Sequence, residues 1–150
     1  MFIKKNIKNL EASSIIQSML YNISYSIIEN LDLRFEHFNE LINIENCIIE
    51  EIQLDAAWFL KGLVFKNNIV KSAISYETGG HNNDIISIEG NIFFGFFDFL
   101  DCHFEDKVFI KNNIFIEGTN ILGNKGKGFE NTFKSGIVTE NNIGNISISE

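Results

Sequence analysis

A short pattern of apolar and polar residues returns along the chain about every 22 residues. It reads FKNNIV at 65–70, and it returns as IKNNIF at 110–115, as TENNIG at 139–144 and, more loosely, as IENCII at 44–49 and IEGNIF at 88–93. A further copy, SIIENLDL at 26–33, matches CIIEEIQL at 47–54. A repeat of this length predicts a solenoid in which each copy forms one coil. The aligned isoleucines, separated by 21, 21, 23, 22 and 29 residues, are Ile27, Ile48, Ile69, Ile92, Ile114 and Ile143.

The columns beside these isoleucines predict short parallel strands with one buried face. Mostly apolar positions alternate with mixed ones, and a period of two is typical of a half-buried strand. The next column alternates in charge, so stacking the copies at about 4.8 Å places each charge between two opposite ones. The alternating positions are Ile42 and Ile44, Leu63 and Phe65, Ile86 and Ile88, Val108 and Ile110, and Ile137 and Thr139, and the charged positions are Glu45, Lys66, Glu89, Lys111 and Glu140.

Two adjacent columns rich in asparagine predict the corners of the coil. Asn and Gly tolerate the left-handed backbone conformation that a tight corner requires. Stacked Asn side chains can also form hydrogen-bonded ladders between copies. The pair is therefore interpreted as a structural corner rather than a binding motif. Its members are Asn46, Asn67, Gly90, Asn112 and Asn141, followed by Cys47, Asn68, Asn91, Asn113 and Asn142.

Residues 1–20 lie outside the clear repeat and predict an N-terminal segment with a short capping helix, followed by a repeat domain over 21–150. Ser14 and Gln17 have the spacing of a capping box. A helix here would cover the open end of the stack. Its apolar side would consist of Ile15, Ile16, Met19 and Leu20. At the other end, NISISE (145–150) has strand-like alternation without a cap, so either the chain is truncated or this end meets another subunit.

The composition agrees with a single β-rich domain. The 150 residues include 15 Phe, 11 Gly and no Pro, a mixture that favours strands and tight turns. The net charge of -8 argues against binding to nucleic acid or to an anionic membrane, because phosphate contacts need clustered Lys and Arg. No stretch has the length of a membrane span, and Cys47 and Cys102 form neither a disulfide framework nor a metal-ligand pattern. The expected location is the cytoplasm.

Apolar residues also recur at five-residue steps, from Ile44 to Ile74 and from Phe94 to Ile114. In this respect residues 21–150 resemble the pentapeptide-repeat proteins and their looser relatives, in phrases such as LDAAWFLKGLVFKNNIV (54–70) and FLDCHFEDKVFIKNNIF (99–115). Coils of that family are shorter and prefer a small residue where this chain has Asn67 and Asn112. The predicted fold class is all-β, a right-handed parallel β-helix solenoid of about six coils with a short N-terminal capping helix.

The histidines are the strongest candidates for functional residues in the sequence. In repeat register one column, which precedes a buried Phe position and so faces outward, consists of His37, Trp58, His81 and His103, with Thr132 in the fifth copy. His81 and His103 lie one coil apart and are candidates to share a metal ion, with Asp84 and Asp101 as oxygen ligands. The alternative is a surface stripe or part of a binding face. No nucleophile, metalloprotease or paired-carboxylate motif is present, so neither an enzyme nor a cofactor is predicted.

The stretch NIFFGFFDF (91–99) holds more apolar residues than an alternating strand can bury. Exposed members would mark a contact surface, whereas a bulge at Gly95 would bury them all. The residues concerned are Phe93, Phe94, Phe96 and Phe97. Two insertions, at 76–84 and 122–128, are expected to leave the stack as loops that contribute to binding.

These observations predict a non-catalytic β-helical scaffold or protein-interaction module whose partner is another protein. Its contact residues are expected among the phenylalanines of 91–99 and the column of His and Trp. Two alternatives stay open. One is a metal-binding or enzymatic protein that uses His81 and His103. The other comes from the resemblance: some relatives imitate duplex DNA in shape and charge and bind topoisomerases, which implies an acidic DNA mimic. A homodimer through the C-terminal end of the solenoid is a further prediction.

Overall fold

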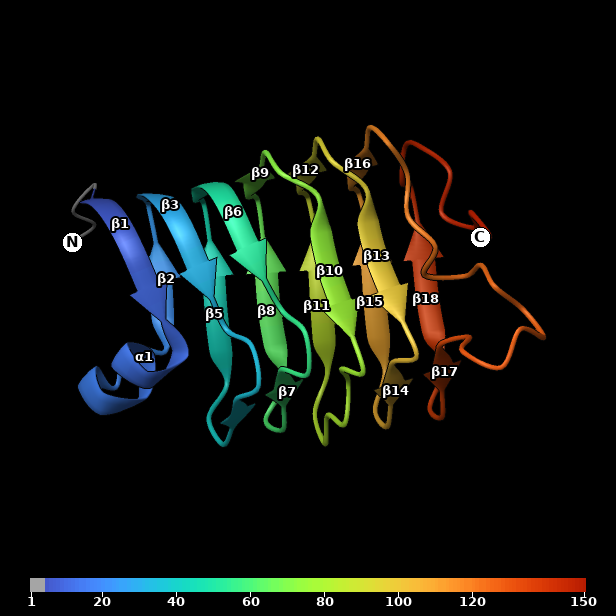
Figure 1. The fold of residues 1–150 in the computed structure, drawn as a ribbon, viewed down its shortest axis with the longest axis horizontal. Helices are drawn as coiled ribbons and strands as arrows, with labels where there is room; N and C mark the ends of the chain where they lie inside the picture. The colour runs from blue at the N-terminus through green and yellow to red at the C-terminus, as the bar shows by residue number, and fades with distance from the viewer. Residues whose placement is uncertain (1–4) are drawn as a thin grey trace.

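The computed structural model describes residues 5–150, which form a parallel β-solenoid of about five turns with one short helix near the N-terminus (Figure 1). In Figure 1 the chain descends along the near side and rises along the far side as it advances from the N-terminus to the C-terminus, so the coil is right-handed. The predicted fold class is confirmed. The predicted number of coils is too high, because a stack of six strands contains only five steps.

Two parallel six-stranded sheets run the length of the solenoid. Sheet A contains, in spatial order, β1 (Lys5–Glu11), β3 (Ser26–Asp32), β6 (Ile48–Gln53), β9 (Ile69–Val70), β12 (Ile92–Phe93) and β16 (Ile114–Phe115). Sheet B contains β2 (Asn22–Ser24), β5 (Ile42–Glu45), β8 (Leu63–Lys66), β11 (Ile86–Glu89), β15 (Val108–Lys111) and β18 (Ile137–Glu140). The two-stranded sheets pair β4 (His37–Phe38) with β7 (Trp58–Phe59), β10 (Ile74–Glu77) with β13 (Phe97–Leu100), and β14 (His103–Phe104) with β17 (Thr132–Phe133).

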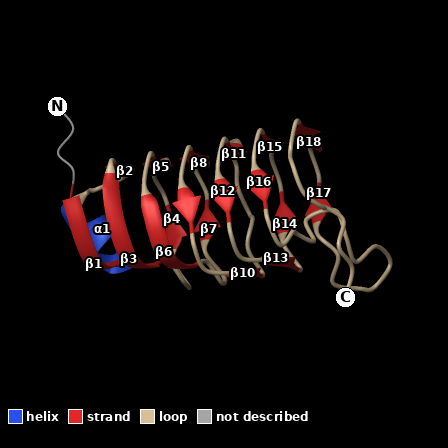
Figure 2. Cartoon of the chain, turned by 90° about the horizontal axis from the view of Figure 1, so that it is seen from above, coloured by secondary structure: helices blue, strands red, loops and turns tan. Residues whose placement is uncertain are grey.

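Each coil has four sides, which Figures 1 and 2 show from two directions. The chain rises in sheet B on the far side, crosses the upper edge at the start of sheet A, descends on the near side and returns along the lower edge through β4, β7, β14 or β17. Strands β3 and β6 continue from the upper edge onto the near side without a break. Later coils carry one more residue at this bend, at 71–73 and 94–96, and the strand divides there into β9 and β10 or β12 and β13.

The strand register confirms the predicted column of alternating charge. Glu45 pairs with Lys66, Lys66 with Glu89, Glu89 with Lys111 and Lys111 with Glu140. Two of these contacts reach ion-pair distance: Lys66 Nζ lies 3.7 Å from Glu89 Oε2, and Lys111 Nζ lies 3.6 Å from Glu140 Oε2. Exposed ion pairs are worth at most about 1 kcal/mol each, so this column favours the register more than it adds to the stability.

The two asparagine columns have different structural roles. The first forms the corner between sheet B and the upper edge, in the left-handed conformation, with φ between 55° and 70° at Asn46, Asn67, Gly90, Asn112 and Asn141. The second column points into the solenoid, where Asn68, Asn91 and Asn113 are at most 1% exposed. The predicted corner is therefore confirmed for the first column, and the second lines the inside of that corner.

The inward asparagines form the predicted ladder. The backbone N–H of Cys47, Asn68 and Asn91 each donates to the side-chain oxygen of the asparagine in the next coil, at 2.9, 2.9 and 3.0 Å. Asn113 donates in the same way to Asn142, at 3.0 Å. The side-chain amides of the three buried asparagines each donate at 2.9 Å to a backbone carbonyl of sheet B, at Ile44, Phe65 and Ile88. The ladder thus satisfies the buried backbone N–H groups that the corner leaves unpaired.

The core is a stack of large apolar side chains, and the repeat isoleucines are not part of it. The residue after each of four repeat isoleucines points inward and is at most 2% exposed: Ile49, Val70, Phe93 and Phe115. Aromatic rings stack along the axis, with centroids 5.1 Å apart for Phe93 and Phe115. The repeat isoleucines point outward, and all but Ile143 are half-buried by the neighbouring coils.

Only one of the two predicted loops leaves the stack. Residues 76–84 stay within the coil, because the buried Tyr76 donates from its hydroxyl to Ala57 O at 2.8 Å and accepts from the Gly80 N–H at 3.1 Å. The expectation of a protruding loop there is wrong. The second segment does protrude (Figure 1), and Lys125 to Gly128 are exposed. Residues 145–150 form no strand but lie along 119–124, where the Thr119 N–H donates to Asn145 O at 2.8 Å.

The N-terminal segment belongs to the solenoid. Strand β1 pairs in parallel with β3, so the stack begins before residue 21. Helix α1 (Ala12–Ser18) begins after Glu11, and no side chain caps it, so the predicted capping box at Ser14 is wrong. Of the predicted apolar side only Ile15 is buried, and Ile16, Met19 and Leu20 are exposed at the N-terminal end. Within residues 5–150 no helix has the length and apolar character that a membrane span requires.

Candidate interaction surfaces

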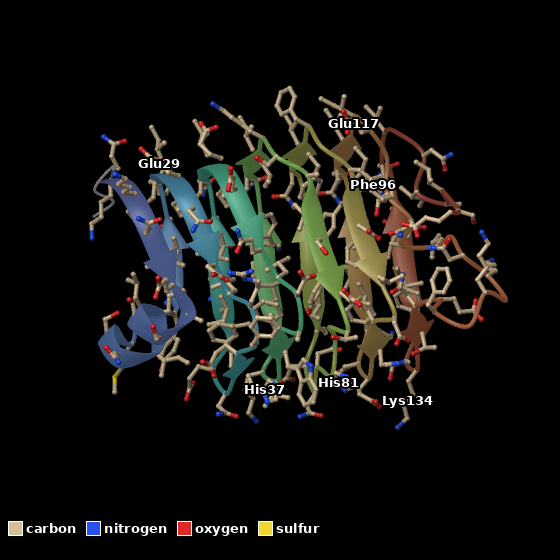
Figure 3. The ribbon with its side chains drawn as sticks, in the orientation of Figure 1. Glu29, His37, His81, Phe96, Glu117 and Lys134 are labelled. Atoms are coloured by element: carbon tan, nitrogen blue, oxygen red, sulfur yellow. The ribbon has the colours of Figure 1, made fainter. Side chains whose placement is uncertain are left out.

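The predicted column of His and Trp forms a stack of rings on the lower edge. The rings of His37 and Trp58, which pair in register, lie 3.9 Å apart and 3° from parallel. The centroid of His81 lies 4.1 Å from that of Trp58 and 6.0 Å from that of His103. Figure 3 shows His37 and His81 along this edge. Gly80, not His81, occupies the register position between Trp58 and His103, and the left-handed conformation of His81 (φ 53°) brings its ring into the stack.

The four side chains considered for a metal ion do not converge. His103 Nδ1 lies 2.8 Å from Thr132 Oγ1, and His103 Nε2 lies 3.2 Å from Asp101 Oδ1, so both ring nitrogens already have partners. Asp84 instead lines a shallow groove together with Lys61. Among the described residues, no three His, Cys, Asp or Glu side chains lie close enough together to hold a metal ion.

The surroundings of His81 favour its neutral form. Partial burial lowers the pKa of His81, and the charges of His103 and His37 lower it further, while Glu105 acts in the opposite direction. The indole N–H of Trp58 donates to a backbone carbonyl at 3.2 Å. The rings of His37 and Trp58 cover each other's faces, whereas those of His81 and His103 are tilted by 59° from each other.

The phenylalanines of 91–99 divide between the core and the surface. Phe93 and Phe97 are 1% and 2% exposed, so the prediction that they contact a partner is wrong. Phe94 is 47% exposed and Phe96 is half-buried. Gly95 permits the bend between them, since a Cβ there would lie 2.3 Å from a backbone nitrogen of the preceding coil. The expectation that some of these rings are exposed is confirmed, and the bulge that buries all four is not formed.

Phe94 belongs to a larger apolar patch on the upper edge. Ile92 and Phe94 both point outward because the buried Phe93 lies between them. Ile114 pairs with Ile92, Ile116 follows at the position of Phe94, and Ile143 bridges to Ile114 in the last coil. The most exposed members are Phe94, Ile116 and Ile143, at 47%, 55% and 64%. The apolar patch is defined here as Ile92, Phe94, Ile114, Ile116 and Ile143.

Charged side chains bound the apolar patch on its N-terminal side. In the column that contains Phe94, the preceding coils carry Lys71, Glu50 and Glu29. Lys71 Nζ lies 2.8 Å from Glu50 Oε1. Figure 3 shows Glu29 and Glu117 on this upper edge, opposite the edge of the histidines. The upper edge is therefore charged in its N-terminal half and mainly apolar in its C-terminal half, where Glu117 is exposed beside Ile116.

Sequence reasoning did not identify Ile114, Ile116 and Ile143 as surface residues. In the segment IFIEG (114–118) two isoleucines flank Phe115, and alternation allows only one of the two sets to face inward. Phe115 aligns with Phe93, so the signal that places the isoleucines outside lies in the comparison of copies rather than in either copy alone.

No protein-family model matches this chain, and neither does any curated protein or solved structure.

Proposed function

We infer that this protein is a non-catalytic β-solenoid that binds a protein partner through the apolar patch. The observation that carries the proposal is the exposure of Phe94, Ile116 and Ile143 in adjacent coils of one edge. Exposed apolar surface that is contiguous and rimmed by polar residues is typical of interaction sites. The backbone beneath the patch is held by parallel pairing on a continuous stack, so a partner has little chain to order when it binds.

The resemblance to pentapeptide-repeat proteins supports a role without catalysis, because for most of that family it implies no activity. The alternatives have less support. A shared metal ion would have to displace Thr132 or Asp101 from His103. A DNA mimic needs continuous acidic rows in place of phosphates, whereas the column on sheet B alternates in sign and Lys71 interrupts the acidic column of the upper edge. A topoisomerase supercoiling assay tests that alternative directly, and an effect at stoichiometric protein would favour it.

The test of the proposal is affinity capture from a lysate of the native host with three immobilised proteins. These are the wild type, the double variant Phe94→Lys/Ile116→Lys, and the control Ile85→Lys. Ile85 is a matched control because it is also 47% exposed but lies beside sheet B, outside the apolar patch. All three substituted residues are exposed, so each variant should keep the far-ultraviolet spectrum and melting temperature of the wild type.

We expect a partner that the wild type and the Ile85 control retain and the double variant loses. The physical reason is that a lysine ammonium placed in an apolar contact must give up its hydration without a counter-charge. Retention of the same proteins by all three samples, or by none, would contradict the proposal.

A further inference from the structure

We propose that the outer edge of β18 binds an extended segment of another protein, which pairs with it as a further parallel strand of sheet B. The sequence of this segment begins with an apolar residue, any residue, a second apolar residue and a basic residue. An asparagine follows two residues after the basic one. Addition of a strand to an exposed sheet edge is a common mode of peptide recognition. The inference goes beyond the apolar patch, because it concerns a different surface and a different kind of contact.

Strand β18 is the last strand of sheet B in the part of the chain that the structure describes. It pairs with β15 on one side, and no described strand pairs with its other side. In earlier coils the N–H groups of Ile86 and Val108 donate to carbonyls of the following coil, at 3.1 and 3.3 Å. Ile137 occupies the same position in β18, so its N–H points away from β15. Alternate residues of a parallel strand direct their N–H and C=O to the same side, so Thr139 presents both groups there as well.

The core is only partly covered at this edge. Val108 and Ile110 are 0% and 1% exposed, whereas Ile137 and Thr139, which follow them in register, are only half-buried. In Figure 2 the protruding loop and the C-terminus lie on the opposite side of the coil from β18. An added strand would cover Ile137 and Thr139 with every second side chain. The two covering residues are therefore expected to be apolar.

The alternating charge column specifies the basic residue of the segment. In the stack Glu45 is followed by Lys66 and Glu89 by Lys111. Glu140 continues the column, with Lys111 Nζ at 3.6 Å on one side and a side chain that is 56% exposed. Opposite charges on directly paired residues stabilise a strand pair and like charges destabilise it. A Lys or Arg of the segment opposite Glu140 is therefore the complementary choice.

The asparagine ladder specifies a second residue of the segment. The Asn91 N–H donates to Asn113 Oδ1, and the Asn113 N–H donates to Asn142 Oδ1, both at 3.0 Å. The next donor in this series is the Asn142 N–H. An asparagine of the segment can accept from it in the same way, and the spacing from Lys111 to Asn113 places that asparagine two residues after the basic one.

A second copy of this chain does not supply these groups. At the N-terminal edge of sheet B, Ser24 pairs with Glu45 and therefore occupies the charge column. Ser26 occupies the ladder column, one coil before Cys47. A head-to-tail contact would thus place no cation beside Glu140 and no carboxamide beside Asn142. Strand β18 itself contains no basic residue, so a tail-to-tail contact between two β18 strands lacks the cation too. The chemistry therefore favours a different protein.

The probe is the peptide VFIKNNIF, which has the sequence of residues 108–115, joined to a polyethylene glycol chain for solubility. Paired in parallel with β18, it places its lysine opposite Glu140. Nuclear magnetic resonance of the full 150-residue chain measures the affinity and the hydrogen exchange of the Ile137 and Thr139 amides. The comparison peptides carry Lys111→Glu or Asn113→Ala.

Two protein variants accompany the wild type in this titration. Glu140→Lys reverses the charge at the proposed contact. The matched control is Glu29→Lys, which makes the same charge change at an exposed position in the N-terminal half of the upper edge (Figure 3). Both positions are exposed, so both variants should keep the far-ultraviolet spectrum of the wild type.

We expect the wild type and the Glu29→Lys control to bind the parent peptide with slower exchange of the Ile137 and Thr139 amides. The Lys111→Glu peptide should bind the wild type at least about fivefold more weakly, and Glu140→Lys should reverse this preference. The Asn113→Ala peptide should bind at least about threefold more weakly than the parent, because it leaves the Asn142 N–H without an acceptor.

The inference is overturned if the parent peptide does not bind at concentrations up to about 1 mM. It is also overturned if the Lys and Glu peptides bind equally well, or if binding leaves the exchange of the β18 amides unchanged. Dependence of these amide signals on the protein concentration alone would place a second copy at the edge, against the inference. The Phe94→Lys/Ile116→Lys variant should bind the peptide as the wild type does, so failure here and failure of the apolar patch are distinguishable.

Discussion

The interior asparagine ladder gives the sharpest test of how this solenoid is held together. Asn113 is fully buried, and its side-chain oxygen accepts from the Asn91 backbone N–H at 3.0 Å while its amide donates to Ile88 O at 2.9 Å. Its neighbour Asn112 is exposed and forms the left-handed corner at φ 56°. The two adjacent asparagines therefore differ in burial, in hydrogen bonding and in backbone conformation. Substitution of each by alanine separates the contributions of these properties to the free energy of unfolding.

The expected cost of Asn113→Ala follows from the backbone N–H that loses its partner. The Asn91 N–H would remain buried without a hydrogen bond, at about 1–3 kcal/mol, whereas Ile88 O belongs to a strand that stays paired in sheet B. Since a domain of this kind is stable by only about 5–15 kcal/mol, this loss is measurable. Asn112→Ala keeps every buried hydrogen bond and costs only the left-handed conformation, about 1–2 kcal/mol.

The assay is equilibrium unfolding in urea, followed by far-ultraviolet circular dichroism and by tryptophan fluorescence of Trp58. Two probes are needed because a repeat protein can unfold in steps, and only coincident curves permit a single free energy of unfolding. Asn112→Gly is the control, because glycine adopts positive φ at no steric cost. Its free energy of unfolding should stay within about 0.5 kcal/mol of the wild type.

The reasoning fails if Asn113→Ala costs less than Asn112→Ala, or if both cost less than about 1 kcal/mol. Either result would mean that the buried carboxamides do no more than fill space. An equal loss in both alanine variants, with Asn112→Gly also destabilised, would instead place the important contacts at the corner.

The same ladder predicts a gain of stability where its first position lacks a carboxamide. Cys47 is buried in the asparagine column and its thiol lies 3.8 Å from Ile23 O. An asparagine at this position would donate to Ile23 O and accept from the Ser26 N–H, by analogy with Asn68 one coil later. We expect Cys47→Asn to raise the free energy of unfolding by about 0.5–1.5 kcal/mol per new hydrogen bond. A loss of stability in the same urea assay would contradict the ladder geometry.

Three further predictions concern single sites. Gly95→Ala should cost about 1–3 kcal/mol in urea unfolding, because its Cβ would lie 2.3 Å from the backbone nitrogen of Ala73; an unchanged midpoint would show that the bend can move. Partial burial lowers the pKa of His81 in the folded state below its ordinary value. The neutral His81 side chain therefore contributes to the free energy of unfolding above about pH 6.5, and this contribution is lost as the pH falls below that value. The melting temperature of His81→Asn should therefore fall less on acidification than that of the wild type, and an equal fall would contradict this. Limited trypsin digestion should cut first after Lys125 or Lys127, in the protruding loop, and mass spectrometry showing a first cut elsewhere would be inconsistent with that loop.

The stacking of the coils could be predicted from the sequence because two independent columns agree. The isoleucine spacing and the alternating charges place Glu45, Lys66 and Glu89 in the same register, and the structure has that register. Every coil of a solenoid has nearly the same geometry, so each copy of the repeat gives independent evidence for the same alignment. Errors in one copy, such as the displaced His81, do not affect the alignment of the others.

Features that occur only once were predicted poorly. The helix begins at Ala12 rather than after a capping box at Ser14, because Ala12 and Ile15 are buried against the N-terminal end of the core. The insertion at 76–84 remains in the coil because Tyr76 is large enough to reach Ala57 across the interior. Neither outcome has a second copy in the chain against which to check it.

The buried asparagines determine which residues of the following strand form the apolar patch, and the sequence contains the information needed to predict this. A buried carboxamide must lie inside the corner, where it satisfies backbone groups, so Asn113 fixes the inward set of the strand that follows. Residues alternate from there, which turns Phe115 inward and Ile114 and Ile116 outward. Hydrophobicity alone gives no such assignment, since all three side chains are apolar. The outward isoleucines are thus a consequence of the buried asparagine, and any partner that binds them depends on a polar group in the core for the position of its binding site.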